Sequence, residues 1–257
     1  MRIRFFLFYG IMLAICLMVT TSIQAKVDPG IVVGMWLFDK DGDTTDVSGK
    51  GHDGKVEGNV KWVDGKFGKA VELDGNSFVL VDHANDMNLE KFTLMAWVKI
   101  ATAPADWWTI AAKDGWPNRN YGVWLASGTG LAHHSFTSGA APDNNAINAV
   151  TPVTAGSWYH VAATYDMQVS SLYINGKLDA QGNFTVKPNA TDVQFIVGRT
   201  ANGSYKLVGD VDEIGLFNQA LSDKDINDII ANGLSPVTSP VSPKASIVTT
   251  WADVKLR

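Results

Sequence analysis

The sequence predicts an all-β fold of two packed antiparallel sheets, with one short helix near the C-terminus. Short stretches rich in alternating, β-branched and aromatic residues recur along the chain, and glycine-rich turns separate them. Only one stretch has the period of an amphipathic helix. Strands that are joined by turns, without helices between them, are typical of antiparallel sandwiches rather than of βαβ units.

The chain begins with a segment typical of a secretory signal peptide. Arg2 and Arg4 give it a positive start, residues 5–19 are apolar apart from Gly10, and the small polar segment TTSIQA follows. The apolar run is shorter than the about 20 residues of a membrane span. We expect cleavage after Ala25 and a secreted, periplasmic or cell-surface protein that is not inserted in the membrane.

Cysteine content and net charge limit the disulfides and the partners that the exported chain can have. The single cysteine, Cys16, lies in the predicted signal, so the exported chain is expected to have no disulfide. Two arginines and no acidic residue leave with the signal, so the formal charge changes from −5 to −7. A mildly acidic chain does not favour nucleic acid or an anionic membrane as a partner.

The clearest strand is FTLMAWVKI. Its alternation predicts that one set of side chains faces the core: Phe92, Leu94, Ala96, Val98 and Ile100. The residues between them are expected to point to the opposite face of the sheet.

A hairpin and a helix are specified by local signals. The Asn175-Gly176 pair in SLYINGKLD predicts a two-residue β-hairpin. In ALSDKDINDIIANG, Ser222 is the expected N-cap and Asp225 completes a capping box, while Gly233 ends the helix. We expect this helix to lie across the outside of the sandwich.

Three Ser-Pro pairs follow the helix and predict an extended spacer with a short tail over 235–257. The tail is either a frayed terminus or a tag for export or surface attachment. One domain is therefore predicted over 26–234, between the signal 1–25 and this tail.

Several motifs together resemble the laminin-G-like, concanavalin A-like jelly-roll domains of bacterial secreted proteins. They are WLFD at 36–39, DVSGKGHDG at 46–54, GKFGKAVELDG at 65–75 and the closing GDVDEIGLFNQALSDKDI. Leu73 stands where the family usually has phenylalanine. The resemblance covers about residues 31–234 and implies a jelly roll. It does not fix a function, because this fold carries lectins, adhesion modules and hydrolases.

The resemblance also implies one structural calcium between the first strand and the closing strand. Asp39, Asp46 and Asp212, together with loop carbonyls, would hold it, because calcium prefers several oxygen ligands. A regular strand points Asp212 and Glu213 to opposite faces, so only one of them is expected to reach the ion. The alternative is that these acids cap turns.

No catalytic arrangement is evident in the sequence. Glycosidases need two carboxylates about 5–10 Å apart, and the chain lacks the alternating acidic strand that would supply them. No nucleophile-elbow motif accompanies the histidines. We therefore predict a protein that is not an enzyme.

The tryptophan-rich segment 105–128 is the main candidate for a ligand site. Trp124 lies in a predicted strand and is expected to pack in the core or on the sheet surface, and Trp107 and Trp108 stand at a strand end. Trp116 lies in a polar turn. Its ring either packs onto a neighbouring strand or stays open and stacks on a sugar.

Polar residues of this turn and of two further loops, HHSFTSGAAPDNNA and GRTANGSYK, would complete a carbohydrate site at one end of the sandwich. The predicted ligand-binding residues are Trp116, Asn118, Arg119, Tyr121, His134, Asp143, Asn144 and Arg199. The leading hypothesis is a secreted, non-catalytic module that binds a glycan or polysaccharide with calcium support. The alternatives are an adhesion or structural protein that binds a cell-surface or extracellular protein, and a divergent glycoside hydrolase.

Overall fold

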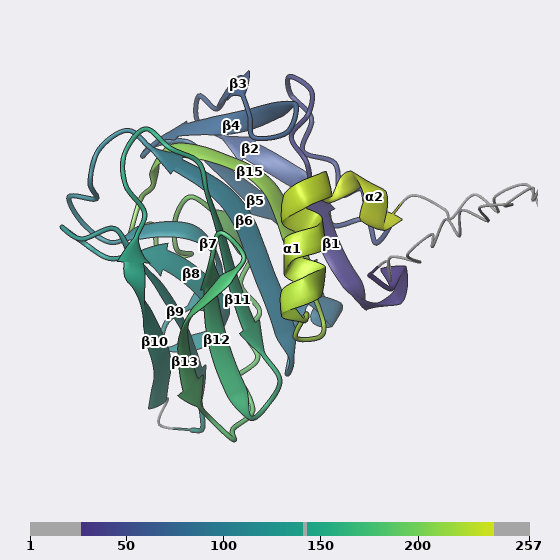
Figure 1. Ribbon diagram of the computed structural model, residues 1–257, viewed down its shortest axis with the longest axis vertical. Helices are drawn as coiled ribbons and strands as arrows, with labels where there is room; N and C mark the ends of the chain where they lie inside the picture. The colour runs from purple at the N-terminus through teal and green to yellow at the C-terminus, as the bar shows by residue number, and fades with distance from the viewer. Residues whose placement is uncertain (1–26, 141–142, 239–257) are drawn as a thin grey trace, which may run out of the picture.

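Two stacked antiparallel β-sheets form the protein, as the computed structural model in Figure 1 shows. The structure describes residues 27–140 and 143–238. The predicted signal 1–25 and most of the predicted tail lie outside the described residues.

The first sheet has eight strands, in the order β13-β12-β11-β6-β15-β4-β3, and β1 pairs with β15 beside this path. The strands are β1 (Val32–Trp36), β3 (Lys61–Asp64), β4 (Lys69–Asp74), β6 (Phe92–Ile100), β11 (Tyr159–Tyr165), β12 (Val169–Ile174), β13 (Lys177–Asn183) and β15 (Val208–Phe217).

The second sheet has seven strands, in the order β10-β9-β8-β7-β14-β5-β2. The strands are β2 (Gly54–Glu57), β5 (Phe78–Val81), β7 (Trp108–Gly115), β8 (Asn118–Leu125), β9 (Leu131–Ser138), β10 (Asp143–Pro152) and β14 (Phe195–Val197). Two short 3-10 helices, Pro29–Ile31 and Asn85–Met87, precede β1 and β6 in the chain. The predicted all-β sandwich is confirmed.

The core lies between the two sheets, and β6 shows how the sequence specifies it. All five residues that were expected to face inward, Phe92, Leu94, Ala96, Val98 and Ile100, belong to the central apolar cluster. Met95 points the other way, into a second cluster beneath the helix. The predicted alternation of this strand is confirmed.

The helix α1 (Asp223–Asn232) covers part of the outer face of the eight-stranded sheet (Figure 1). Ser222 caps its N-terminus and forms the predicted capping box with Asp225. Ile226 and Ile229 pack on Met95 and the other residues of the second cluster. The helix therefore covers part of the outer face of this sheet, whereas the outer face of the seven-stranded sheet has no such cover among the described residues.

Local predictions are confirmed at one hairpin and corrected at two other places. Asn175 and Gly176 join β12 to β13, and both have positive φ angles, as a type I′ turn requires. HHSFTSGAAPDNNA, expected as a loop, contains most of β9 and the start of β10. The start of the predicted spacer forms the short helix α2 (Ser235–Thr238), in which Val237 is buried in the second cluster.

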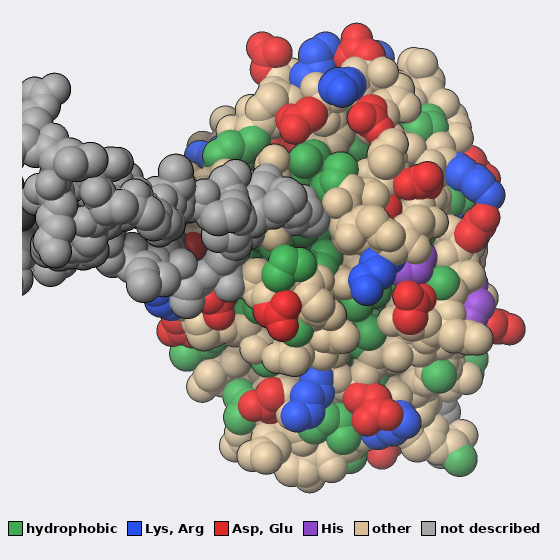
Figure 2. Space-filling model, turned by 90° about the vertical axis from the view of Figure 1, so that its right-hand side faces the viewer, with side chains coloured by type: hydrophobic (Ala, Val, Ile, Leu, Met, Phe, Trp, Pro, Cys, Tyr) green, Lys and Arg blue, Asp and Glu red, His purple; other side chains and the backbone are tan. Residues whose placement is uncertain are grey.

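The surface carries both signs of charge. Figure 2 shows one face of the molecule on which acidic and basic side chains are interspersed. Within the described residues, no helix has the length and apolar character needed to cross a membrane.

Candidate binding site

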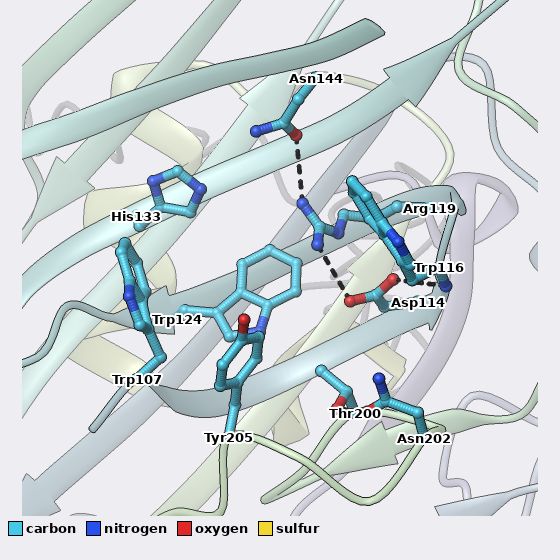
Figure 3. Close-up of a pocket in the computed structure, with 10 residues that line it drawn as sticks. All are labelled: Trp107, Asp114, Trp116, Arg119, Trp124, His133, Asn144, Thr200, Asn202 and Tyr205. Carbon is cyan, nitrogen blue, oxygen red and sulfur yellow. Dashed lines mark hydrogen bonds and ion pairs between the residues drawn. The ribbon is translucent and has the colours of Figure 1, made fainter. Parts of the chain in front are cut away.

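A cavity of about 410 Å³ lies on the outer face of the seven-stranded sheet. Val123 and Leu125 of β8 belong to the core, so Trp124 between them points to the outer face and into the cavity. Ten residues line the cavity: Trp107, Asp114, Trp116, Arg119, Trp124, His133, Asn144, Thr200, Asn202 and Tyr205 (Figure 3). Strands β7 to β10 supply half of them. The sequence predicted a site made of loops at one end of the sandwich, whereas the structure builds it on a sheet face together with loops.

The polar part of the floor is a buried ion pair. Asp114 and Arg119 are register partners on β7 and β8, on either side of the tight turn that carries Trp116. Arg119 Nη2 donates to Asp114 Oδ2 at 3.1 Å, and the Trp116 amide donates to the other carboxylate oxygen at 3.1 Å. The pair therefore fixes both the floor and the position of the Trp116 backbone.

The guanidinium of Arg119 is held through both of its terminal nitrogens. Nη1 donates to the Ser135 hydroxyl and to Asn144 Oδ1. The guanidinium carbon lies 4.5 Å from the centre of the Trp124 ring and 5.9 Å from that of Trp116. Such cation–π contacts strengthen when they are shielded from water. Arg119 is thus a rigid part of the floor.

Aromatic side chains border the cavity on two sides (Figure 3). Trp107 meets the His133 ring edge-on, with the ring centres 5.0 Å apart, and lies 6.5 Å from the Tyr205 ring. On the other side stands Trp116, whose side chain is 61% exposed. An exposed tryptophan beside a polar floor is a surface on which the C–H face of a ligand can stack.

The surroundings of His133 favour its neutral form. Burial lowers its pKa below the ordinary value, Arg119 lowers it further, and only the hydrogen bond with Asn148 opposes these effects. The Nδ1 atom lies 2.8 Å from Asn148 Oδ1.

The third border of the cavity is the loop that carries Thr200, Asn202 and Tyr205. Thr200 Oγ1 donates to Asn202 Oδ1 at 2.6 Å, and the Tyr205 carbonyl accepts from the Thr109 amide at 2.7 Å. Arg199 lies outside the cavity, where it pairs with Glu57 and donates to the Thr200 carbonyl. These bonds order the loop before any ligand binds.

Three of the predicted ligand-binding residues, Trp116, Arg119 and Asn144, line the cavity. Two others are corrected. Tyr121 is fully buried in the core and donates to the Met87 carbonyl, and His134 packs in the core against Phe92. The β7–β8 register shifts at Asn120, so Arg119 and Tyr121 face opposite sides although they are two positions apart.

The remaining predicted residues lie near the cavity without lining it. Asn118 is exposed and accepts a hydrogen bond from the Asn189 side chain. Asp143 is exposed at the start of β10, and Arg199 supports the loop described above.

Sequence reasoning missed Asp114, His133 and Thr200. A two-residue turn at Trp116-Pro117 places Asp114 opposite Arg119. Recognising this turn in the sequence would therefore have predicted the ion pair. His133 and His134 are adjacent in a strand, and the sequence alone does not say which of them faces outward.

The predicted calcium ligands do not form one group. Asp46 is buried, and its two oxygens accept from the Met35, Ser48 and His52 amides and from the Ser48 hydroxyl. Its carboxylate therefore holds the turn that begins at Asp46 through four donors of the protein. Over residues 27–140 and 143–238, no three acidic, histidine or cysteine side chains are placed to hold a metal together.

Asp39 and Asp212 remain close to each other at the turn Gly65–Gly68. A Cβ atom on Gly68 would lie 2.0 Å from Asp39 Oδ1, and one on Gly65 would lie 2.7 Å from Asp212 Oδ2. Asp212 is fully buried; its Oδ2 accepts from the Lys66 and Phe67 amides, whereas Oδ1 has no hydrogen-bond partner among the described residues.

The expectation that Glu213 faces away from Asp212 is wrong. β15 has an irregular register after Asp212, and Glu213 has a φ of 51°, so the alternation is broken there. Burial raises the pKa of Asp212 to about 7 and that of Glu213 to about 7, and the negative charge of Asp39 acts in the same direction on both.

Residues 73–227 match the family described as the concanavalin A-like lectin/glucanases superfamily. The chain belongs to this family. The resemblance seen in the sequence is thereby confirmed. No curated protein matches the chain at a significant level.

Several solved structures have a similar fold. The binding domain of Paraclostridial Mosquitocidal Protein 1 has a TM-score of 0.67 at 15% identity and covers 79% of this chain and 52% of its own. Domain 4 of AbnA, an extracellular arabinanase from Geobacillus stearothermophilus, was solved with arabinotriose. It has a TM-score of 0.60 at 23% identity, over 78% of this chain and 98% of its own.

The binding domain of botulinum neurotoxin DC was solved with rat synaptotagmin II and with SialylT. In the latter complex it has a TM-score of 0.64 at 19% identity, over 79% of this chain and 51% of its own. The chain spans about half the length of these toxin binding domains. At such identities the likenesses establish the fold.

Proposed function

We propose that the protein is a non-catalytic carbohydrate-binding module and that the cavity on the seven-stranded sheet is its site. One observation carries this proposal: the exposed ring of Trp116 borders a cavity whose floor is the buried Asp114–Arg119 pair. A sugar has apolar C–H faces, which suit an aromatic ring, and hydroxyl groups, which suit fixed polar groups at the edge of that ring.

Size and preorganisation support the proposal. The volume of about 410 Å³ lies within the roughly 300–1,000 Å³ that is usual for small-molecule sites. Asp114 and Arg119 are held by hydrogen bonds within the protein, so little side-chain entropy is lost on binding. The likeness to Domain 4 of AbnA, which was solved with arabinotriose, points to the same class of ligand.

The acid content of the cavity supports a role without catalysis. Asp114 is the one carboxylate among the described residues that line it, and it is paired with Arg119. Glycoside hydrolysis by the common mechanisms needs two carboxylates flanking the bond. Because the start of the sequence is typical of a secretory signal, we also propose that this binding takes place outside the cytoplasm.

A structural calcium at the turn Gly65–Gly68 is the second part of the proposal. The unpartnered, buried Asp212 Oδ1 fits a cation ligand, since a buried carboxylate oxygen without a partner is costly. Asp39 would be the second carboxylate. Backbone carbonyls and water, which calcium accepts, would have to supply the other ligands. The ion would stabilise the turn and strand β15, and Asp39 and Asp212 are not among the residues that line the cavity.

The test is a glycan array probed with the purified protein in calcium-containing buffer, followed by calorimetric titration of each hit. Wild type is compared with Trp116→Ala and with Trp158→Ala, which truncates a half-buried tryptophan outside the cavity. We expect binding that Trp116→Ala weakens and Trp158→Ala leaves intact. An array without any binding would overturn the proposal, and adhesion to a protein would become the leading hypothesis.

A further inference from the structure

We propose that the cavity selects uncharged sugars over sugars that carry a carboxylate, sulfate or phosphate. This inference rests on the proposed function and names the ligand class of the same site. It follows from how completely the charges of the floor are compensated within the protein.

The formal charges of the residues that line the cavity cancel. Asp114 and Arg119 are the formally charged residues among those that line it, and they pair with each other at 3.1 Å. Both side chains are at least nine-tenths buried. An anionic sugar would therefore lose its hydration and meet a carboxylate as readily as a guanidinium.

Arg119 cannot present a free fork to an anion. Nη2 is bonded to Asp114, and Nη1 to Ser135 and Asn144. The Nε atom is buried without an acceptor among the described residues. Strong recognition of a carboxylate by arginine uses two parallel N–H donors of one guanidinium. Three of the five N–H groups of Arg119 are bonded and the Nε–H is buried, so no such pair is open to a ligand.

The groups that remain available are neutral. The Arg119 N–H is a donor, so Asn144 must turn its oxygen to it and keep its NH2 group for a ligand (Figure 3). Asn202 is constrained in the same way, because its oxygen accepts from Thr200 and from the Ser204 amide. Two amide NH2 groups, the Tyr205 hydroxyl and neutral His133 thus surround the cavity, and each can bond a sugar hydroxyl.

The experiment is calorimetric titration of the wild-type protein with matched oligosaccharides: arabinotriose, and gluco- and galacto-oligosaccharides beside their uronate counterparts. We expect at least tenfold tighter binding of the neutral member of each pair that binds. The affinity should also be almost constant between 50 and 500 mM NaCl, since no ionic contact forms. Tighter uronate binding that weakens with salt would overturn the inference and leave the proposed function standing. Binding of neither kind would overturn the proposed function, and the inference with it.

A variant tests the cause. Asp114→Asn keeps an acceptor for the Trp116 amide but removes the counter-charge of Arg119. We expect its affinity for the uronates to rise at least tenfold. Asp143→Asn is the matched control, because it removes a nearby exposed negative charge outside the cavity. An equal gain in both variants, or none in Asp114→Asn, would contradict the proposed role of the ion pair. The salt series on wild type decides the matter if Asp114→Asn does not fold.

Discussion

The guanidinium carbon of Arg119 lies 4.5 Å from the centre of the Trp124 ring, on the outer face of β8. Trp124 is only 2% exposed, yet it is covered by residues of the site and not by the sandwich core. The His133 ring, 5.9 Å away, adds to this cover. A buried aromatic floor with a fixed cation above it gives the cavity a shape that does not depend on the ligand.

Trp116→Ala should weaken carbohydrate binding by about 30-fold, or about 2 kcal/mol, as expected for a tryptophan on which the ligand stacks. The side chain is 61% exposed, so the free energy of unfolding should change by no more than about 0.5 kcal/mol. Calorimetric titration and urea unfolding measure the two quantities on the same samples. A loss of binding that is accompanied by a large loss of stability would instead assign Trp116 to packing.

Removing one member of the Asp114–Arg119 pair should destabilise the protein more than removing both. Asp114→Ala leaves a buried guanidinium without its counter-charge, which costs about 3–5 kcal/mol. The double variant with Arg119→Ala removes that charge, so part of the loss should be recovered. Urea unfolding of the two single variants and the double variant completes the cycle. Additive losses would show that the two charges do not interact.

The sequence predicted the fold well wherever local signals agree with the tertiary structure. The alternation of β6, the Asn175-Gly176 hairpin and the capping box at Ser222 each depend on a few neighbouring residues. Their geometry follows from the period of a strand, the positive φ of a turn and the unpaired amides of a helix end. The family motifs added the order of these elements.

The cavity residues and the acidic residues of β15 were predicted only in part, because irregular register in two strands determines which way their side chains face. At Asn120 the shifted register sends Arg119 outward and Tyr121 inward, and at Glu213 the positive φ breaks the alternation of β15. Neither position carries a glycine that would mark it. The facing of His133 is likewise set by the β9 register, which only the assembled sheet fixes.

Acid should weaken the fold through His160. Both of its ring nitrogens are buried without a hydrogen-bond partner among the described residues, and burial lowers its pKa from 6.5 to about 3. The unfolded chain binds a proton below pH 6.5 that the folded state excludes. The stability contributed by the neutral ring is therefore present above pH 6.5, and about 1.4 kcal/mol of it is lost per pH unit as the pH falls toward 3.

His160→Phe isolates this effect, because Phe keeps an aromatic ring beside Trp97 and does not titrate. The free energy of unfolding of the variant minus that of wild type should be constant from pH 7 to 9 and rise as the pH falls from 6.5 to 4. His134, whose pKa burial also lowers to about 3, is present in both proteins and cancels. Parallel stability curves across the whole range would contradict the prediction.

Calcium should raise the thermal midpoint of the wild-type protein, and Asp212→Asn should abolish the shift. At one hundred times the dissociation constant a single site adds about 2.7 kcal/mol, which is a shift of several degrees for a domain of this size.

Asn at 212 keeps an oxygen for the Lys66 and Phe67 amides and replaces the unpartnered Oδ1 by a neutral group. In chelator above pH 7, where the Asp212 carboxylate is charged, the variant should therefore be at least as stable as wild type, since a buried charge without a partner is removed. Asp210→Asn is the matched control, because Asp210 lies two residues away and pairs with Lys99. An equal calcium shift in wild type and Asp212→Asn would place any ion elsewhere, and no shift in wild type would remove calcium from the proposal.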